Sequence, residues 1–163
     1  MSMLDRRLFL LSGAALAACG PSEAASRTET AFAGSPWRKL SDADWKKRLS
    51  PLSDRVLRHE ATERAGTSPL DHEKRRGTFV CAGCALPLFK SEWKFDSGTG
   101  WPSFYTAMKQ NIATKRDLVL LIPRTEYHCA RCLGHQGHIF DDGPRPTGLR
   151  YCNNGVALKF IAA

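Results

Sequence analysis

The chain has 163 residues and a formal net charge of +8. Without its first 18 residues, about 145 remain, which is enough for one domain that buries a single hydrophobic core without disulfide staples. The first 18 residues carry a net charge of +1, so +7 remains on the rest. We attribute that charge to solubility or to contact with a charged cell envelope, because an exported protein rarely meets nucleic acid.

The first 18 residues have the composition of an export signal. Arg6 and Arg7 precede an apolar run that extends to Ala18, and the pair resembles a twin-arginine signal. The run is too short and too rich in Ala and Gly to predict a membrane span. We therefore expect residues 1–18 to be a signal peptide outside the fold.

The signal ends in the string L-A-A-C-G, which resembles a bacterial lipobox with Cys19 as the acylated residue. This predicts a mature protein that begins at Cys19 and contacts a membrane only through that lipid anchor, in the periplasm or the cell envelope. The alternative is an ordinary signal cleaved near Ala24 or Ala25. Small and polar residues over 19–36 predict a flexible tether, and residues 37–163 form the domain.

Helical patterns are confined to the start of the domain. Ser41 is a suitable N-cap for a helix that places Trp45 and Leu49 on one face, four residues apart. Ser50 and Pro51 predict the start of a second helix.

Beyond residue 77 the pattern is that of short strands separated by turns rich in Gly and Pro. Strands are predicted at residues 78–80, 118–122, 125–128, 148–152 and 156–161, of which the second is a continuous apolar run that suits a buried position. Because no helices stand between them, the strands should pair in antiparallel sheets. The expected fold class is mainly β with short N-terminal helices.

Four of the cysteines form two matched C-x-x-C pairs, Cys81 with Cys84 and Cys129 with Cys132. Two such turns supply four soft ligands to a tetrahedral metal with little chain strain, so the pattern favours one structural zinc ion per chain. Iron accepts the same ligands, and two disulfides are the alternative in an exported protein. The pairs are too far apart for a compact nucleic-acid finger. Cys152 is left outside both pairs and is free for chemistry.

Cys152 lies on a predicted strand, where alternate side chains share a face. Arg150, Cys152 and Asn154 should point one way, and Tyr151 and Asn153 the other. A guanidinium beside a cysteine favours the thiolate, which is the nucleophilic form. The alternative is an inert buried thiol.

Upstream, residues 134–142 carry two imidazoles, His135 and His138, on a segment punctuated by glycine. If the chain is extended there, His138, Phe140 and Asp142 share a face, which provides a proton donor, an apolar wall and a carboxylate that orients an imidazole. Metal ligation or plain surface exposure are the alternatives for the histidines. Together with the free cysteine, these residues favour a thiol active site.

Four motifs, in order, resemble the methionine sulfoxide reductase B family. They are the string Ser97-Gly98-Thr99-Gly100-Trp101-Pro102-Ser103-Phe104, the two C-x-x-C pairs, the string G-H-Q-G-H-I-F at 134–140, and Arg150-Tyr151-Cys152-Asn153-Asn154. The resemblance runs from about Trp37 to the C-terminus. It implies two antiparallel sheets, zinc held by the four paired cysteines, and reduction of methionine-R-sulfoxide, free or in proteins, back to methionine.

The resemblance also implies roles for single residues. Cys152 would attack the sulfoxide sulfur, and His135 and His138 would position and protonate the sulfoxide oxygen, with Asn154 and Arg150 in support. An oxygen that leaves sulfur must be protonated, and an imidazole can do this near neutral pH.

On the substrate side, the resemblance assigns Trp101 to an aromatic wall that accepts the S-methyl group. Contact between sulfur and an aromatic ring suits such a group. Phe140 is the second apolar residue expected beside the substrate. A core position is the alternative for Trp101.

The chain departs from the family pattern at three places. Many members have, in place of Thr99, a cysteine that resolves the sulfenic acid formed on the nucleophile. Thr99 therefore implies an external thiol reductant, such as a thioredoxin-like protein. We expect the enzyme to be a monomer. Gly155 stands where the family usually has serine. Residues 66–70 diverge from the usual Thr-Glu pattern of the entry loop.

Other functions are compatible with the same cysteines. A zinc-stapled binding module would use them for folding alone, with Cys152 buried and unreactive. A thiol peroxidase or disulfide oxidoreductase would need a redox-active free pair, whereas the metal accounts for both pairs. Repair of oxidised envelope proteins is the function that we expect.

Overall fold

The computed structural model describes residues 28–118 and 123–163. Its strands form two antiparallel sheets, of three strands in the order β2-β1-β9 and of six strands in the order β3-β4-β8-β7-β6-β5. The strands are β1 (Gly77–Cys81), β2 (Pro87–Lys90), β3 (Lys94–Phe95), β4 (Ser103–Phe104), β5 (Ile112–Asp117), β6 (Arg124–Cys129), β7 (His135–Phe140), β8 (Arg150–Asn153) and β9 (Leu158–Ala162). Residues 28–31 are helical. The helices that follow are α2 (Asp42–Arg48) and α3 (Pro51–His59), with 3-10 turns η1 (Pro36–Lys39), η2 (Pro69–His72), η3 (Ser91–Trp93), η4 (Lys109–Asn111) and η5 (Gly155–Ala157). The expected class, mainly β with two antiparallel sheets and short N-terminal helices, is confirmed.

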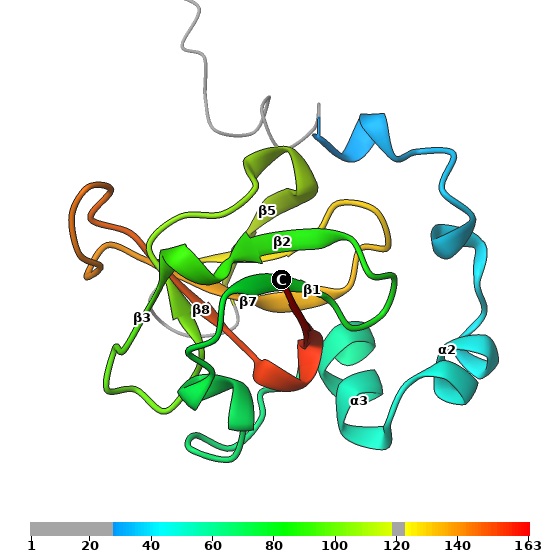
Figure 1. Cartoon of the computed structure of the whole chain (residues 1–163). Helices are drawn as coiled ribbons and strands as arrows, with labels where there is room; N and C mark the ends of the chain where they lie inside the picture. Colours follow the sequence, from blue (N-terminus) through cyan, green and yellow to red (C-terminus); the bar gives the residue numbers. More distant parts are fainter. Residues whose placement is uncertain (1–27, 119–122) are drawn as a thin grey trace, which may run out of the picture.

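Both N-terminal helices begin where their caps predict. The Ser41 hydroxyl accepts a hydrogen bond from the Asp44 N–H, and the Asp44 carboxylate accepts one from the Ser41 N–H, which makes a reciprocal capping box for α2. The Ser50 hydroxyl accepts from the Ser53 N–H, and Pro51 is the first residue of α3. Figure 1 shows the two helices at one side of the sheets, where α3 packs beside β7.

Four of the five expected strands correspond to β1, β6, β8 and β9, with ends shifted by one or two residues. The fifth, residues 118–122, lies mostly outside the described residues. Its first residue, Leu118, is 64% exposed and follows β5, so a buried strand position is wrong for Leu118. β5 went unpredicted because only Ile112 and Ala113 are buried in it, and the rest of the strand is polar.

Aromatic rings fill the space between the two sheets. Phe89 of β2 stacks on Phe104 of β4 with ring centroids 4.1 Å apart. Its edge also meets Tyr127 of β6 and Tyr151 of β8, each at 6.2 Å between centroids. Figure 1 shows β1 and β2 lying across β7 and β8. Because Tyr151 points into this core, the next residue on β8, Cys152, points to the opposite face of the six-stranded sheet.

The segment before α2 packs against the domain. Glu29 Oε1 lies 3.0 Å from His128 Nε2, and the Arg38 guanidinium donates to the carbonyls of Glu29 and Ala130 at 2.8 and 2.6 Å. The part of the expected tether from residue 28 onward is therefore in contact with the fold. Residues 1–27, with the expected signal and lipobox, lie outside the described residues. Within the described ranges, the helices are all too short or too polar to cross a bilayer.

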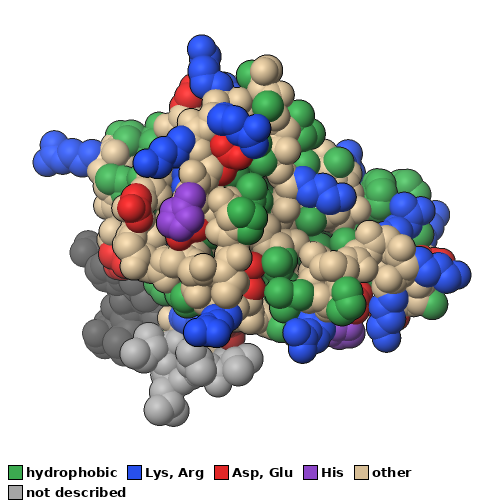
Figure 2. Space-filling view, turned by 60° about the horizontal axis from the view of Figure 1, so that its bottom comes forward, with side chains coloured by type: hydrophobic (Ala, Val, Ile, Leu, Met, Phe, Trp, Pro, Cys, Tyr) green, Lys and Arg blue, Asp and Glu red, His purple; other side chains and the backbone are tan. Residues whose placement is uncertain are grey.

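Basic side chains are spread over the surface. On the face shown in Figure 2, Lys and Arg side chains are separated by polar and apolar atoms. Several of them pair with acids, as Arg75 does with Glu73 and Lys115 with Glu60. On this face the positive charge is dispersed and not gathered into one patch.

Candidate active site and metal centre

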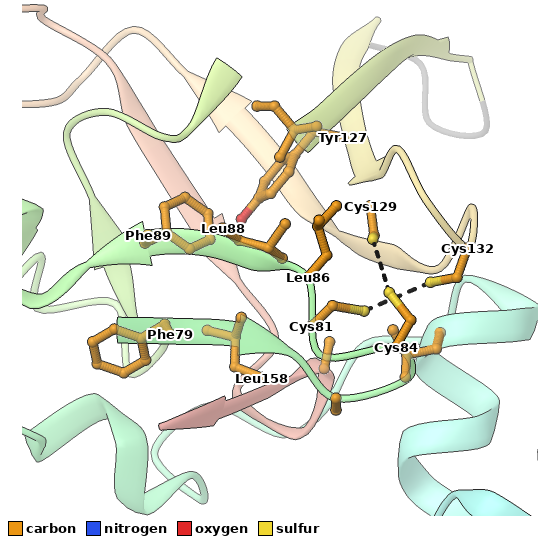
Figure 3. Close-up of a cluster of buried hydrophobic side chains, with 14 of the residues drawn as sticks. Phe79, Cys81, Cys84, Leu86, Leu88, Phe89, Tyr127, Cys129, Cys132 and Leu158 are labelled. Carbon is orange, nitrogen blue, oxygen red and sulfur yellow. Dashed lines mark hydrogen bonds between the residues drawn. The ribbon is translucent and has the colours of Figure 1, made fainter. Parts of the chain in front are cut away.

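Two hairpin turns bring the four paired cysteines together. Cys81 and Cys84 flank the turn between β1 and β2, and Cys129 and Cys132 flank the turn between β6 and β7 (Figure 3). All four side chains are buried, and their sulfurs lie within 4.8 Å of one another. The Sγ–Sγ distances of 3.6 Å (Cys81 to Cys132) and 3.5 Å (Cys84 to Cys129) far exceed the roughly 2.05 Å of a disulfide bond. The cluster is therefore a set of four free thiols with the closeness and donor type of a metal site.

The two turns are built alike. In each, the N–H of the residue after the second cysteine donates to the carbonyl of the first cysteine at 2.8 Å. Those residues, Ala85 and Leu133, have left-handed φ angles of 58° and 60°. Arg131 Nε and Gln136 Nε2 donate to two of the cluster sulfurs at 3.4 and 3.5 Å. Donors around the sulfurs suit thiolates that hold a cation.

Cys152 lies outside this cluster, in β8. Its cross-strand neighbours are Ser103 of β4 and His138 of β7. It borders a pocket of about 220 Å³ lined by Thr62, Trp101, Arg124, Gly137, His138, Phe140, Cys152, Asn153 and Asn154. The pocket thus brings together five of the residues predicted to be catalytic or substrate-binding, namely Cys152, His138, Asn154, Trp101 and Phe140.

Opposing effects set the charge state of Cys152. Burial raises the pKa of its thiol above the ordinary value of 9.0. The positive charge of Arg150 and hydrogen bonds from Thr99, Arg150 and Ser103 lower the pKa, but burial prevails. The thiol form therefore predominates at neutral pH, with donors for the thiolate already in place.

Arg150 is held in position from two sides. Its Nε and Nη2 donate to the two carboxylate oxygens of Asp142 at 2.8 and 2.9 Å, and its guanidinium lies 4.3 Å from the centre of the Phe140 ring. This ion pair lowers the pKa of the Asp142 carboxyl. Asp142 thus orients Arg150 and not an imidazole, contrary to the expectation. The reason is the register of the sheet, which pairs Phe140 with Arg150 and leaves Asp142 beside the guanidinium.

Each imidazole is held by a carboxylate that the sequence patterns did not single out. His138 Nε2 lies 2.8 Å from Asp117 Oδ2, which also accepts from Arg124 Nη2 at 2.6 Å. His135 Nδ1 lies 2.7 Å from Glu126 Oε1, and the two imidazole centroids are 5.5 Å apart. Burial lowers the pKa of His138, and its bond to Asp117 opposes that effect.

His135 does not line the pocket of Cys152. It is 3% exposed and borders a second cavity of about 230 Å³ on the side of Glu126. Its Nε2 is buried without a hydrogen-bond partner among the described residues. The sequence offered a signal for Glu126, because it is a carboxylate inside a predicted strand. It offered none for Asp117, which ends a strand that the sequence did not reveal.

A loop anchored by Glu63 fixes two of the pocket residues. Asn154 lies just beyond β8, where its Oδ1 accepts from the Glu63 N–H and its Nδ2 donates to the Gln136 carbonyl, both at 3.0 Å. Trp101 Nε1 donates to the Glu63 carbonyl at 3.1 Å. The Glu63 carboxylate in turn accepts the two backbone N–H groups that follow Asn154. Glu63 is a further residue that the sequence patterns missed.

The Ser68 side chain occupies the space beside Gly155. A Cβ at position 155 would lie 2.4 Å from the Ser68 Cβ and 1.9 Å from its Oγ. Ser68 is buried, and its hydroxyl accepts from the Leu70 N–H at 3.2 Å. The glycine at 155 and the divergent loop at 66–70 are therefore one packing arrangement.

Comparison with known proteins agrees with this geometry. The SelR domain family matches residues 49–162. The chain is 51% identical to the peptide methionine sulfoxide reductase MsrB of Leptospira interrogans, over 74% of this chain and 92% of the relative. It is 52% identical to the MsrB of Bradyrhizobium diazoefficiens, over 73% of this chain and 86% of the relative. It is also 52% identical to the chloroplastic peptide methionine sulfoxide reductase B1 of Arabidopsis thaliana, over 76% of this chain and 61% of that longer relative.

The chain belongs to the methionine sulfoxide reductase B family. The resemblance drawn from its four motifs is thereby confirmed. The matched part of this methionine sulfoxide reductase B domain begins just before α3 and extends into β9, so it contains the cysteine cluster and the pocket of Cys152.

Proposed function

We propose that the protein reduces methionine-R-sulfoxide to methionine, with Cys152 as the nucleophile. The observation that carries the proposal is the position of Cys152, which borders a pocket with an imidazole and a tryptophan and lies apart from the four clustered thiols. Membership in the methionine sulfoxide reductase B family supports the same reaction.

The reaction transfers one oxygen atom. The Cys152 thiolate attacks the sulfoxide sulfur, the sulfoxide oxygen takes up a proton, and the oxygen ends on Cys152 Sγ as a sulfenic acid. The substrate sulfur is reduced by two electrons to the thioether. His138 lies across the strand from Cys152 and delivers the proton to the oxygen, with His135 behind it. Trp101 and Phe140 line the pocket and offer apolar faces to the S-methyl group.

The metal in the four-cysteine cluster is proposed to be zinc, one per chain. Cys81, Cys84, Cys129 and Cys132 would hold it, and their burial and close approach fit a closed tetrahedral site. When bound, the ion contributes folding energy and no redox chemistry. The role of the site is to join the β1–β2 turn to the β6–β7 turn.

Turnover is proposed to need an external thiol. Within the described residues, the other four cysteines belong to the cluster, and position 99 is a threonine. A dithiol such as a thioredoxin-like protein would reduce the sulfenic acid to the thiol, with water and a disulfide as products. We further propose an exported, lipid-anchored monomer that repairs oxidised envelope proteins, on the basis of the twin-arginine and lipobox patterns. Fractionation of cells and mass spectrometry of Cys19 test the location.

The function is tested with purified protein from residue 20 onward, supplied with dithiothreitol and each sulfoxide epimer separately. We expect reduction of the R-epimer alone, and none with Cys152→Ser, which should keep its metal and its fold. Cys132→Ser is not a suitable control because it disturbs the metal centre. Thr78→Val on β1 is a suitable control, and it should retain full activity. Full activity in Cys152→Ser, or reduction of the S-epimer alone, would refute the assignment and favour a binding module.

A further inference from the structure

Three hydroxyl groups form a connected cluster beside the nucleophile. Ser97 Oγ lies 2.8 Å from Thr99 Oγ1 and 2.8 Å from Ser103 Oγ. The Ser103 hydroxyl is fully buried and lies 3.0 Å from the Trp101 carbonyl oxygen, to which it donates. Ser103 is paired with Cys152 in the register of β4 and β8, so their side chains share one face of the sheet, and Ser97 joins Ser103 to Thr99. The Thr99 hydroxyl is also among the groups that lower the pKa of Cys152.

The hydroxyl cluster (Ser97, Thr99 and Ser103) lies on the flank of Cys152 opposite the imidazole. Ser103 of β4 pairs with Cys152 on one side of β8, and His138 of β7 pairs with it on the other. The pocket is lined by other side chains. These three hydroxyls are therefore not placed to contact a molecule bound in the pocket.

Thr99 lies in a turn between two glycines with left-handed backbone conformations. The glycines on either side, Gly98 and Gly100, have left-handed φ angles of 68° and 81°. A Cβ at position 100 would lie 2.7 Å from the Gly66 backbone nitrogen. Left-handed conformations on both sides of one residue favour glycine, and the Thr99 hydroxyl in this turn lies 2.8 Å from Ser97 Oγ.

The number of protons decides what the cluster can donate. Each hydroxyl carries one proton, so Ser97 can donate to only one of its two neighbours. When Ser97 donates to Thr99, the single proton of Thr99 is free for Cys152 Sγ. Ser103 then turns its proton from the Trp101 carbonyl to Ser97 Oγ, so that both bonds within the cluster are kept. The cluster can thus give a thiolate one hydroxyl donor, in addition to the Arg150 guanidinium.

We propose that Ser97, Thr99 and Ser103 form a hydroxyl relay that stabilises the Cys152 thiolate, with Thr99 as the donor to the sulfur and Ser97 and Ser103 as the positioning residues for Thr99. Thr99 is then part of nucleophile activation and not merely the position of an absent resolving cysteine. The inference rests on the proposed role of Cys152 as nucleophile.

The other titratable groups near Cys152 come from three strands. Arg150 lies on β8 itself, and His138 lies opposite Cys152 on β7. From β6, Arg124 lines the same pocket, and Tyr127 has its hydroxyl 3.5 Å from the Cys152 carbonyl oxygen. β4 contributes Ser103 and no charge at this point. A change in a hydroxyl of the cluster should therefore alter the Cys152 pKa without altering the charges around it.

The test measures the pKa of Cys152 from the pH dependence of its alkylation by iodoacetamide in the zinc-loaded protein, with the modified site located by mass spectrometry. Thr99→Val keeps the shape and removes the hydroxyl. Loss of this hydrogen bond to the charged sulfur should raise the Cys152 pKa by about one unit. Alkylation at a pH well below that pKa should then slow about tenfold. Thr99→Ser should stay within about 0.3 units of the wild type, because it keeps the donor. Ser97→Ala should raise the Cys152 pKa by less than Thr99→Val does.

Thr78→Val, on the three-stranded sheet, is the matched control and should leave the Cys152 pKa unchanged. Zinc content and near-ultraviolet circular dichroism report the fold of each variant. An unchanged Cys152 pKa in folded Thr99→Val, or an equal shift in Thr99→Ser, would overturn the relay. If instead the pKa shifts as expected but Cys152→Ser still reduces the sulfoxide, the relay stands and the assignment of the nucleophile fails.

Discussion

Replacing Glu126 by Gln tests the buried carboxylate that bonds to His128 and His135. Glu126 is 2% exposed, and its two oxygens lie 2.7 Å from His135 Nδ1 and 3.1 Å from His128 Nδ1. Burial works to raise its pKa, but the hydrogen bonds from His128 and His135 prevail and lower it to about 2. Gln keeps the shape of the side chain and removes the charge.

The pKa shift sets the expected size of the effect. A decrease from 4.5 to about 2 corresponds to roughly 3 kcal/mol of folding free energy at neutral pH. Because the pKa of the folded state lies below that of the unfolded state, this contribution is complete above about pH 5 and is lost as the pH falls through 4.5 toward 2. At pH 4, about 1 kcal/mol of it should already be gone.

The assay is urea unfolding of wild type and Glu126→Gln at pH 7 and pH 4. We expect a difference in unfolding free energy of about 2–4 kcal/mol at pH 7 that shrinks by about 1 kcal/mol at pH 4. R-sulfoxide reduction should also fall about 10–100-fold, since His135 loses the carboxylate that orients it. The control is Glu60→Gln, whose exposed carboxylate pairs with Lys115 and should contribute less than about 1 kcal/mol. A destabilisation equal at both pH values would refute the reasoning.

Three further changes probe the metal, the packing and the turnover. Cys132→Ser should lower bound zinc well below one per chain and destabilise the fold by more than about 3 kcal/mol, because structural zinc contributes on the order of 10 kcal/mol; full zinc content by metal analysis would contradict this. Gly155→Ser should lower the free energy of unfolding in urea by about 1–3 kcal/mol through its clash with Ser68. The double variant with Ser68→Gly should recover most of that loss. If the losses of the two single variants add instead, the two positions do not share one packing arrangement. When the wild type is given substrate without reductant, Cys152 should remain as a trappable sulfenic acid, with no intramolecular disulfide. Thr99→Cys should allow an intramolecular disulfide if its sulfur reaches disulfide geometry. A disulfide between Cys152 and another cysteine of the wild type would disprove the need for an external thiol.

Local patterns predicted much of the fold because each is complete within a few residues. Ser41 and Ser50 cap their helices as expected, since a cap needs only the first turn of its own helix. The alternation along β8 correctly separated Cys152 from Tyr151, which is buried in the core. β5 escaped prediction because most of its residues are polar, and a strand of that kind is defined by its partner.

The sequence by itself determined the family, the four clustered thiols and the separate cysteine, because these depend on residue types at short, fixed spacings. Tertiary structure decided which acid serves which base. Asp142 pairs with Arg150, while Asp117 and Glu126 hold His138 and His135. Such pairs depend on the register of strands that are distant in sequence, and a shift of one residue would exchange every partner. The same dependence on long-range packing explains why the departure at position 155 became intelligible only when Ser68 was seen to fill its space.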